Sequence, residues 1–66
     1  MQESEYKKDI IRRINEARKN GIGLGKLEKE CPDNIGIRVL VGMLNARRFP
    51  LEIWKCVDES LRRLGY

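Results

Sequence analysis

The chain of 66 residues contains no histidine and only two cysteines, Cys31 and Cys56, which lie far apart. Histidine and clustered cysteines are the usual ligands of zinc, and histidine is the commonest general base. The chain therefore lacks the residues typical of a zinc site and of a catalytic site that uses a general base. The sequence also pairs no nucleophile with a base. We therefore expect no metal, no cofactor and no enzymatic activity. We interpret the cysteines as reduced thiols in the core, although the sequence leaves a disulfide between them open.

Long apolar runs are also missing. No stretch approaches the ~20 apolar residues of a membrane span. The first residues, "MQESEYKKDI", carry acids where a signal peptide has a basic stretch and an apolar run. We expect a cytoplasmic protein without membrane contact. A chain of this size buries only about 60% of the surface that its unfolded form exposes, so self-association would add stability.

Basic side chains outnumber acidic ones by 14 to 10, which gives a net charge of +4. The excess lies mainly in the second half. Residues 34–66 carry six basic and three acidic side chains (net +3), whereas residues 1–33 carry eight and seven (net +1). This balance is compatible with a polyanionic partner.

Apolar residues recur at helical spacing near both ends of the chain. A first helix is predicted with Ser4 as its N-cap and an end at Asn20-Gly21. A last helix is predicted to begin at Pro50 and to close at Gly65. The predicted core stripe of the first helix is Tyr6, Ile10, Ile11, Ile14 and Ala17, and that of the last is Leu51, Trp54, Val57, Leu61 and Leu64.

Two further helices are predicted between these. A short one spans about Leu24 to Cys31 and ends before Pro32. The segment from Ile35 to Asn45 is ambiguous, because "IRVLV" between two glycines also fits a strand. No other segment offers that strand a partner, so we expect a helix. The fold class predicted from these elements is all-α, a small bundle of four helices.

The segment "NIGIRVLVGMLNARRFP" resembles the second half of the helix-turn-helix in Cro- and repressor-type (lambda-repressor-like) DNA-binding domains. In this resemblance Asn34 takes the turn position, where it is expected to be left-handed. Ile35, Gly36 and Leu40 match the aliphatic, capping and buried positions, and residues 44–48 match the closing "LN-small-basic-basic" motif. The resemblance implies a helix-turn-helix at about residues 24–46, within a single helical domain of residues 1–66.

The family places its third helix in the major groove. For this chain the resemblance implies an outward face of Arg38, Gly42 and Asn45, with Arg38 placed for a bidentate contact to guanine. Asn45 is expected to cap the helix end or to touch the DNA backbone. Arg47 and Arg48 are expected to bind phosphate, and Lys26 and Lys29 to reach the flanking strand. The opposite stripe, Ile37, Leu40, Val41 and Leu44, is expected to pack on the first and last helices.

Two kinds of function follow. The first is a sequence-specific transcriptional regulator of phage or mobile-element type, acting as a homodimer on double-stranded DNA. The second is a small adaptor or inhibitor that binds a protein partner through the third helix. Seven of the residues 35–44 are Ile, Val, Leu or Met, and Val39 and Met43 have no evident polar role on a face that contacts DNA. An apolar helix is normally covered, by its own chain or by a partner.

Overall fold

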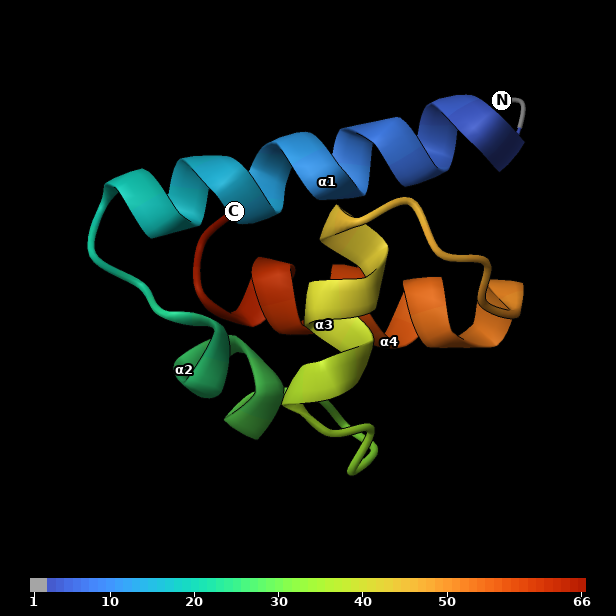
Figure 1. Ribbon diagram of the computed structural model, residues 1–66. Helices are drawn as coiled ribbons and strands as arrows, with labels where there is room; N and C mark the ends of the chain where they lie inside the picture. The colour runs from blue at the N-terminus through green and yellow to red at the C-terminus, as the bar shows by residue number, and fades with distance from the viewer. Residues whose placement is uncertain (1–2) are drawn as a thin grey trace.

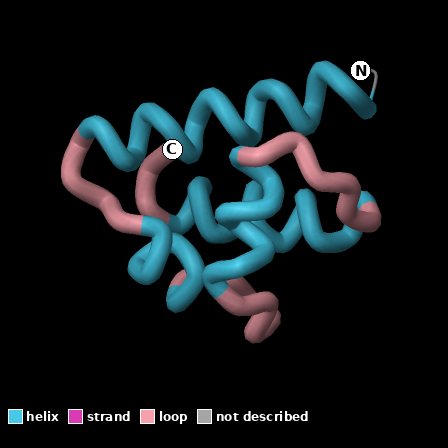
Figure 2. Tube along the Cα trace, in the orientation of Figure 1, coloured by secondary structure: helices cyan, strands magenta, loops and turns pink. Residues whose placement is uncertain are grey.

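The computed structural model describes residues 3–66, so Met1 and Gln2 of the predicted domain lie outside the described residues. This range forms four α-helices and no strand: α1 (Glu3–Lys19), α2 (Leu24–Lys29), α3 (Ile37–Leu44) and α4 (Leu51–Arg63) (Figures 1 and 2). The predicted all-α class is confirmed, and the ambiguous third segment is a helix. Within the described range, no helix has both the length and the apolar composition that a membrane crossing requires.

The four helices enclose one shared core. In Figure 1, α1 lies above α4 and α3 crosses in front of α4. The short helix α2 packs against both α3 and α4. Every helix contributes completely or almost completely buried apolar side chains: Ile10, Ile14, Ala17, Leu27, Leu40, Met43, Trp54, Val57 and Leu61. The predicted stripes of the first and last helices supply most of this core, and Cys31 and Cys56 are free thiols beside it, half-buried and buried.

Several predicted helix boundaries are wrong by one to a few residues. Ser4 lies inside α1 and does not cap it. The second helix ends at Lys29, before the expected Cys31, and the third begins at Ile37, after the expected Ile35. Pro50 flanks α4 as its N-cap residue, one position before the helix begins.

The ends of α1 and α4 follow the prediction. Gly21 and Gly65 have φ values of 87° and 90°, the left-handed conformation that glycine adopts without steric cost. After each helix, two backbone N–H groups donate back to carbonyl oxygens of the last turn. At the end of α1, Gly21 donates to Arg18 and Ile22 donates to Ala17. At the end of α4, Gly65 donates to Arg62 and Tyr66 donates to Leu61. This pattern is the Schellman motif, which satisfies the last carbonyl groups of a helix.

The connection between α2 and α3 spans residues 30–36, longer than the three or four residues typical of a helix-turn-helix. Asn34 was expected to be left-handed, and that expectation is wrong. The residue of this turn with positive φ is Gly36, with φ of 85° and ψ of 151°, and it is also the N-cap of α3 as predicted. This combination of angles is essentially confined to glycine, so asparagine could not take its place.

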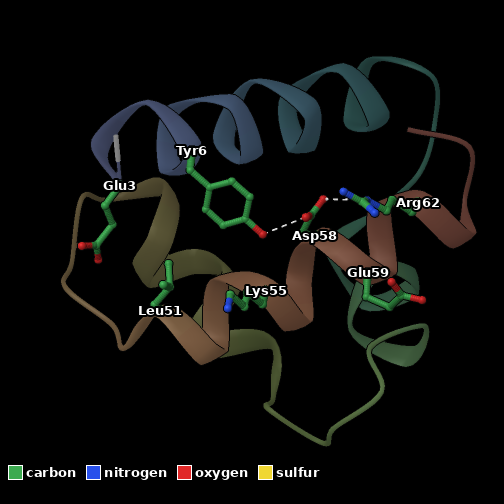
Figure 3. Close-up of a pocket in the computed structure, with 7 residues that line it drawn as sticks. All are labelled: Glu3, Tyr6, Leu51, Lys55, Asp58, Glu59 and Arg62. Carbon is green, nitrogen blue, oxygen red and sulfur yellow. Dashed lines mark hydrogen bonds and ion pairs between the residues drawn. The ribbon is translucent and has the colours of Figure 1, made fainter. Parts of the chain in front are cut away.

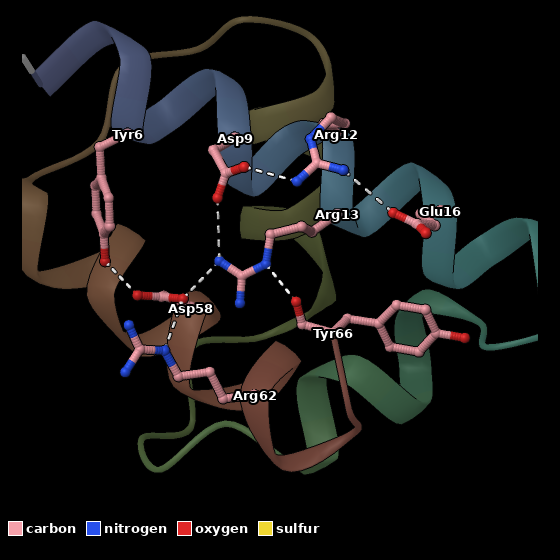
Figure 4. Close-up of polar contacts among 8 residues, drawn as sticks. All are labelled: Tyr6, Asp9, Arg12, Arg13, Glu16, Asp58, Arg62 and Tyr66. Carbon is pink, nitrogen blue, oxygen red and sulfur yellow. Dashed lines mark hydrogen bonds and ion pairs between the residues drawn. The ribbon is translucent and has the colours of Figure 1, made fainter. Parts of the chain in front are cut away.

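A buried acidic residue on α4 ties α1 to α4 (Figure 4). Asp58 accepts hydrogen bonds from the Tyr6 hydroxyl at 2.7 Å and from the Arg13 guanidinium at 2.7 Å. Arg13 also donates to the Tyr66 carbonyl oxygen at 2.6 Å. The side chains of Arg13 and Asp58 are only 12% and 9% exposed, so each charge depends on the other for its solvation.

The same contacts shift two pKa values. Burial alone would raise the pKa of Asp58, but hydrogen bonds from Tyr6 and Arg13 and the charges of Arg13 and Arg62 outweigh it and lower the pKa below its ordinary value. Burial and the hydrogen bond to Asp58 raise the pKa of Tyr6 to about 12. The ionised Asp58 therefore stabilises the fold above pH ~4, and this stabilisation is lost as the pH falls through the lowered pKa. The protonated Tyr6 hydroxyl stabilises the fold below pH ~10, and this stabilisation is lost as the pH rises towards 12.

We expect Asp58→Asn to lower the free energy of unfolding at pH 7 by about 3 kcal/mol, because Arg13 stays largely buried and keeps only the longer contact of 3.4 Å to the carboxylate of Asp9, which is 42% exposed. The variant should also lose less stability than the wild type between pH 5 and pH 2. Denaturant unfolding across this pH range measures both effects. The control is Glu59→Gln, which removes an exposed acid from the same helix and should change stability by less than about 0.5 kcal/mol. Equal losses in the two variants would contradict a special role for Asp58.

Candidate nucleic-acid interface

The core sets the rotation of α3 about its axis. Leu40 and Met43 are completely buried, whereas Ile37 and Val41 are 47% and 44% exposed. The predicted inward stripe is therefore wrong at Ile37 and Val41. At about 100° per residue, the outward face lies about 50° from the predicted one, towards these two side chains. They occupy one side of α3 as an i,i+4 pair.

This rotation also accounts for the apolar residues that lacked a role in the sequence. Met43 belongs to the core, and Val39 is half-buried and packs against it. Leu44, expected inside, is half-buried in the same way. The chain itself thus covers most of the apolar surface of α3. The exposed side of the helix consists of Ile37, Arg38 and Val41, with Asn45 directly after it.

Gly42 is not on the outward face, contrary to the prediction. It is buried, because the segment after α3 folds back across it. A Cβ at this position would lie 2.7 Å from Cζ of Phe49 and 3.3 Å from Cδ of Arg47, and the first distance is shorter than any normal contact. Gly42 therefore makes room for the Phe49 ring and for the stem of Arg47, and so fixes where Arg47 lies.

The end of α3 repeats the Schellman motif with a residue other than glycine. Ala46 has φ of 60°, and among residues 3–66 it is the sole non-glycine residue with positive φ. Its N–H donates to the Met43 carbonyl, and that of Arg47 donates to the Gly42 carbonyl at 2.9 Å. The Asn45 side chain donates to the Val41 carbonyl at 3.0 Å, so it caps the helix end as expected. These bonds turn the chain sharply and bring Arg47 beside α3.

A hollow of about 230 Å³ results on this side of the molecule. Four of the predicted site residues, Arg38, Gly42, Asn45 and Arg47, line it together with Val41. Two arginines thus flank one exposed apolar side chain, and no acidic residue takes part in the lining.

The surrounding charges have the same sign. Residues 34–51 contain Arg38, Arg47 and Arg48 and no aspartate or glutamate. In the described part of the chain, every ion pair joins side chains of α1 or α4. The three arginines are exposed and available to an external anion. We call Ile37, Arg38, Val41, Asn45, Arg47 and Arg48 the α3 surface.

The predicted lysines are not brought into the hollow. Lys26 and Lys29 are exposed on α2, the helix that packs against α3, but neither lines the hollow. Only a partner larger than the hollow, such as a duplex, would reach them.

A second hollow, of about 520 Å³, lies between α1 and α4 (Figure 3). Glu3, Asp58 and Glu59 line it together with two basic residues, Lys55 and Arg62. The three acids already take part in ion pairs, with Lys7, Arg13 and Arg63 among their partners. This mixed lining carries no positive excess, so it does not match a polyanion as the α3 surface does.

Comparisons of the chain with protein-family models, with curated proteins and with solved structures find no significant match. The resemblance to Cro- and repressor-type domains therefore stays a prediction, and so does the helix-turn-helix.

We expect Ala46→Gly to raise the free energy of unfolding by about 0.5–1 kcal/mol. It removes the steric cost of an L-residue in the left-handed region, about 1–2 kcal/mol, and part of this gain is offset by the greater freedom of glycine in the unfolded chain. Gly21→Ala is the converse experiment, since Gly21 also has a positive φ and an added Cβ would meet no atom within 4 Å. It should lower stability by a similar amount. A loss of stability in Ala46→Gly, measured by denaturant unfolding, would contradict the strain at Ala46.

Proposed function

We propose that the protein binds double-stranded DNA and acts as a sequence-specific transcriptional regulator. The α3 surface enters the major groove in this proposal. Arg38 contacts base edges, and Arg47 and Arg48 bind the phosphates that flank them. The cytoplasm is the proposed location, because that is where an intracellular regulator meets its DNA.

One observation carries the proposal: an exposed helix face and the loop after it hold three arginines and no acid, whereas five of the seven acids of α1 and α4 are engaged in ion pairs. A surface of one sign attracts a partner of the opposite sign and raises its association rate. DNA offers phosphates along both edges of the groove, which suits arginines on a helix and on the segment that follows it.

The length of α3 supports a homodimer. Eight residues span about 12 Å, which corresponds to about four base pairs at 3.4 Å each. A single copy therefore contacts too few base pairs to select one site among many. Two copies related by a two-fold axis would recognise a palindromic site of twice that length.

A protein-binding adaptor is the second candidate, and the exposure of Ile37 and Val41 is the observation that favours it. Exposed apolar side chains on one helix face are typical of helix docking sites. The burial of Met43 and the partial burial of Val39 reduce the apolar surface available to such a partner, however, and the arginines around it would have to be matched by acids. The geometry therefore supports DNA more than a protein.

For the wild type we expect duplex binding that weakens steeply with salt, with a log–log slope of about −0.9 per phosphate contacted. The double substitution Arg47→Ala/Arg48→Ala should weaken binding to all sequences about equally and reduce the slope by about two. Fluorescence anisotropy with a random-sequence duplex at several salt concentrations measures both quantities.

The matched control is Arg18→Ala/Lys19→Ala, which removes the same two charges from the exposed end of α1. It should leave the slope almost unchanged. Equal effects of the two double variants would mean that net charge, and not the α3 surface, is responsible. Absence of duplex binding at low salt would refute the proposal altogether.

The dimer is tested by sedimentation of the protein with and without a duplex of about 20 base pairs. We expect two protein chains per duplex at saturation. A limit of one chain per duplex, with no self-association of the free protein, would contradict the homodimer and leave DNA binding intact.

A further inference from the structure

The polar groups of the α3 surface leave little for hydrogen-bond recognition of bases. Asn45 donates one N–H of its side-chain amide to the Val41 carbonyl oxygen, which orients the amide at the end of the helix and leaves it one N–H and its Oδ1. The stem of Arg47 packs against Gly42, with its Cδ 3.3 Å from where a Cβ would lie, and Arg47 follows the end of α3, which suits a phosphate contact. Arg38 is the one polar side chain within the exposed side of the helix itself. Hydrogen bonding from α3 therefore specifies about one base pair.

The remaining exposed groups on α3 are aliphatic. Ile37 and Val41 are 47% and 44% exposed and stand one helical turn apart on the side that also carries Arg38. Val41 lines the hollow between Arg38 and Arg47. No acidic residue lies between positions 34 and 51, so whatever covers these two side chains also meets three uncompensated positive charges. A polyanion with an apolar group inside its groove fits this combination.

The major groove of DNA presents one such group, the C5 methyl of thymine. We propose that Ile37 and Val41 are specificity-determining residues that contact thymine methyl groups next to the base pair contacted by Arg38. This inference rests on the proposed function and extends it from duplex DNA to thymine-containing sites. Side chains at i and i+4 lie about 5–6 Å apart, so the two methyl groups belong to neighbouring base pairs or to pairs two steps apart.

The experiment begins with selection of bound sequences from a random library of duplexes of about 20 base pairs. The preferred duplex is then synthesised with thymine, or with deoxyuridine at one thymine position at a time. Deoxyuridine keeps the charge and the base pairing and lacks only the methyl group. We expect the wild type to lose affinity about fourfold at each contacted position, the effect of one buried methyl group.

The variants assign each methyl group to a side chain. The Val41→Ala variant should have the same affinity for the thymine duplex and for the duplex with deoxyuridine at one of the two sensitive positions. The Ile37→Ala variant should show the same equality for the other sensitive position. Both changes introduce the strongest helix former at an exposed site, so the fold is retained. Arg38→Ala is the matched control: it should relax the preference at one base pair and keep the full difference between thymine and deoxyuridine.

Three results would overturn the inference. Equal binding of both duplexes by the wild type, or selection without any enriched sequence, refutes methyl recognition and leaves general DNA binding in place. Unchanged DNA affinity in Ile37→Ala and Val41→Ala, together with reduced self-association in sedimentation, assigns these side chains to a contact between two copies of the chain. Absence of any duplex binding at low salt refutes the proposed function itself.

Discussion

Leu40 and Met43 anchor α3 in the core, and their complete burial decides which side of the helix meets the solvent. With these two side chains inside, Ile37 and Val41 must point outward, next to Arg38 and Asn45. The rest of the core keeps this arrangement rigid, since α2 packs against both α3 and α4, and Asp58 joins α4 to α1 through Tyr6 and Arg13. The composition of the outward face is therefore a consequence of packing at the opposite face.

The segment after α3 depends equally on close packing. Gly42 leaves a space that the Phe49 ring and the Arg47 stem fill, and Ala46 accepts a strained left-handed conformation to reverse the chain there. The two features act together, because the Arg47 N–H donates to the Gly42 carbonyl oxygen. A helix end that glycine would form at lower cost is thus formed by alanine. The outcome is that Arg47 and Arg38 line the same hollow, and no acid takes part in its lining.

The sequence predicted the four helices and the glycines that end α1 and α4, because periodic apolar residues and left-handed turns are local signals. It did not predict the rotation of α3. Ile37, Leu40, Val41 and Met43 of α3 are all apolar, and Arg38 is its one polar side chain. A single polar residue leaves the exact direction of the exposed face open, so tertiary packing decides it. The role of Asp58 was equally hidden, since its partner Tyr6 lies 52 residues away. Gly42 was expected on the outward face, and the space that the Phe49 ring needs at this position is visible only in three dimensions.

The most direct test of the account is to map the surface that contacts DNA. Amide NMR spectra of the ¹⁵N-labelled protein would be recorded during titration with a random-sequence duplex at low salt. We expect shift changes to concentrate at residues 37–48, with Arg38, Val41 and Arg47 among the largest. Tyr6, Lys55 and Glu59 in the hollow between α1 and α4 should change little. Changes confined to α1 and α4, or no changes at all, would contradict this expectation.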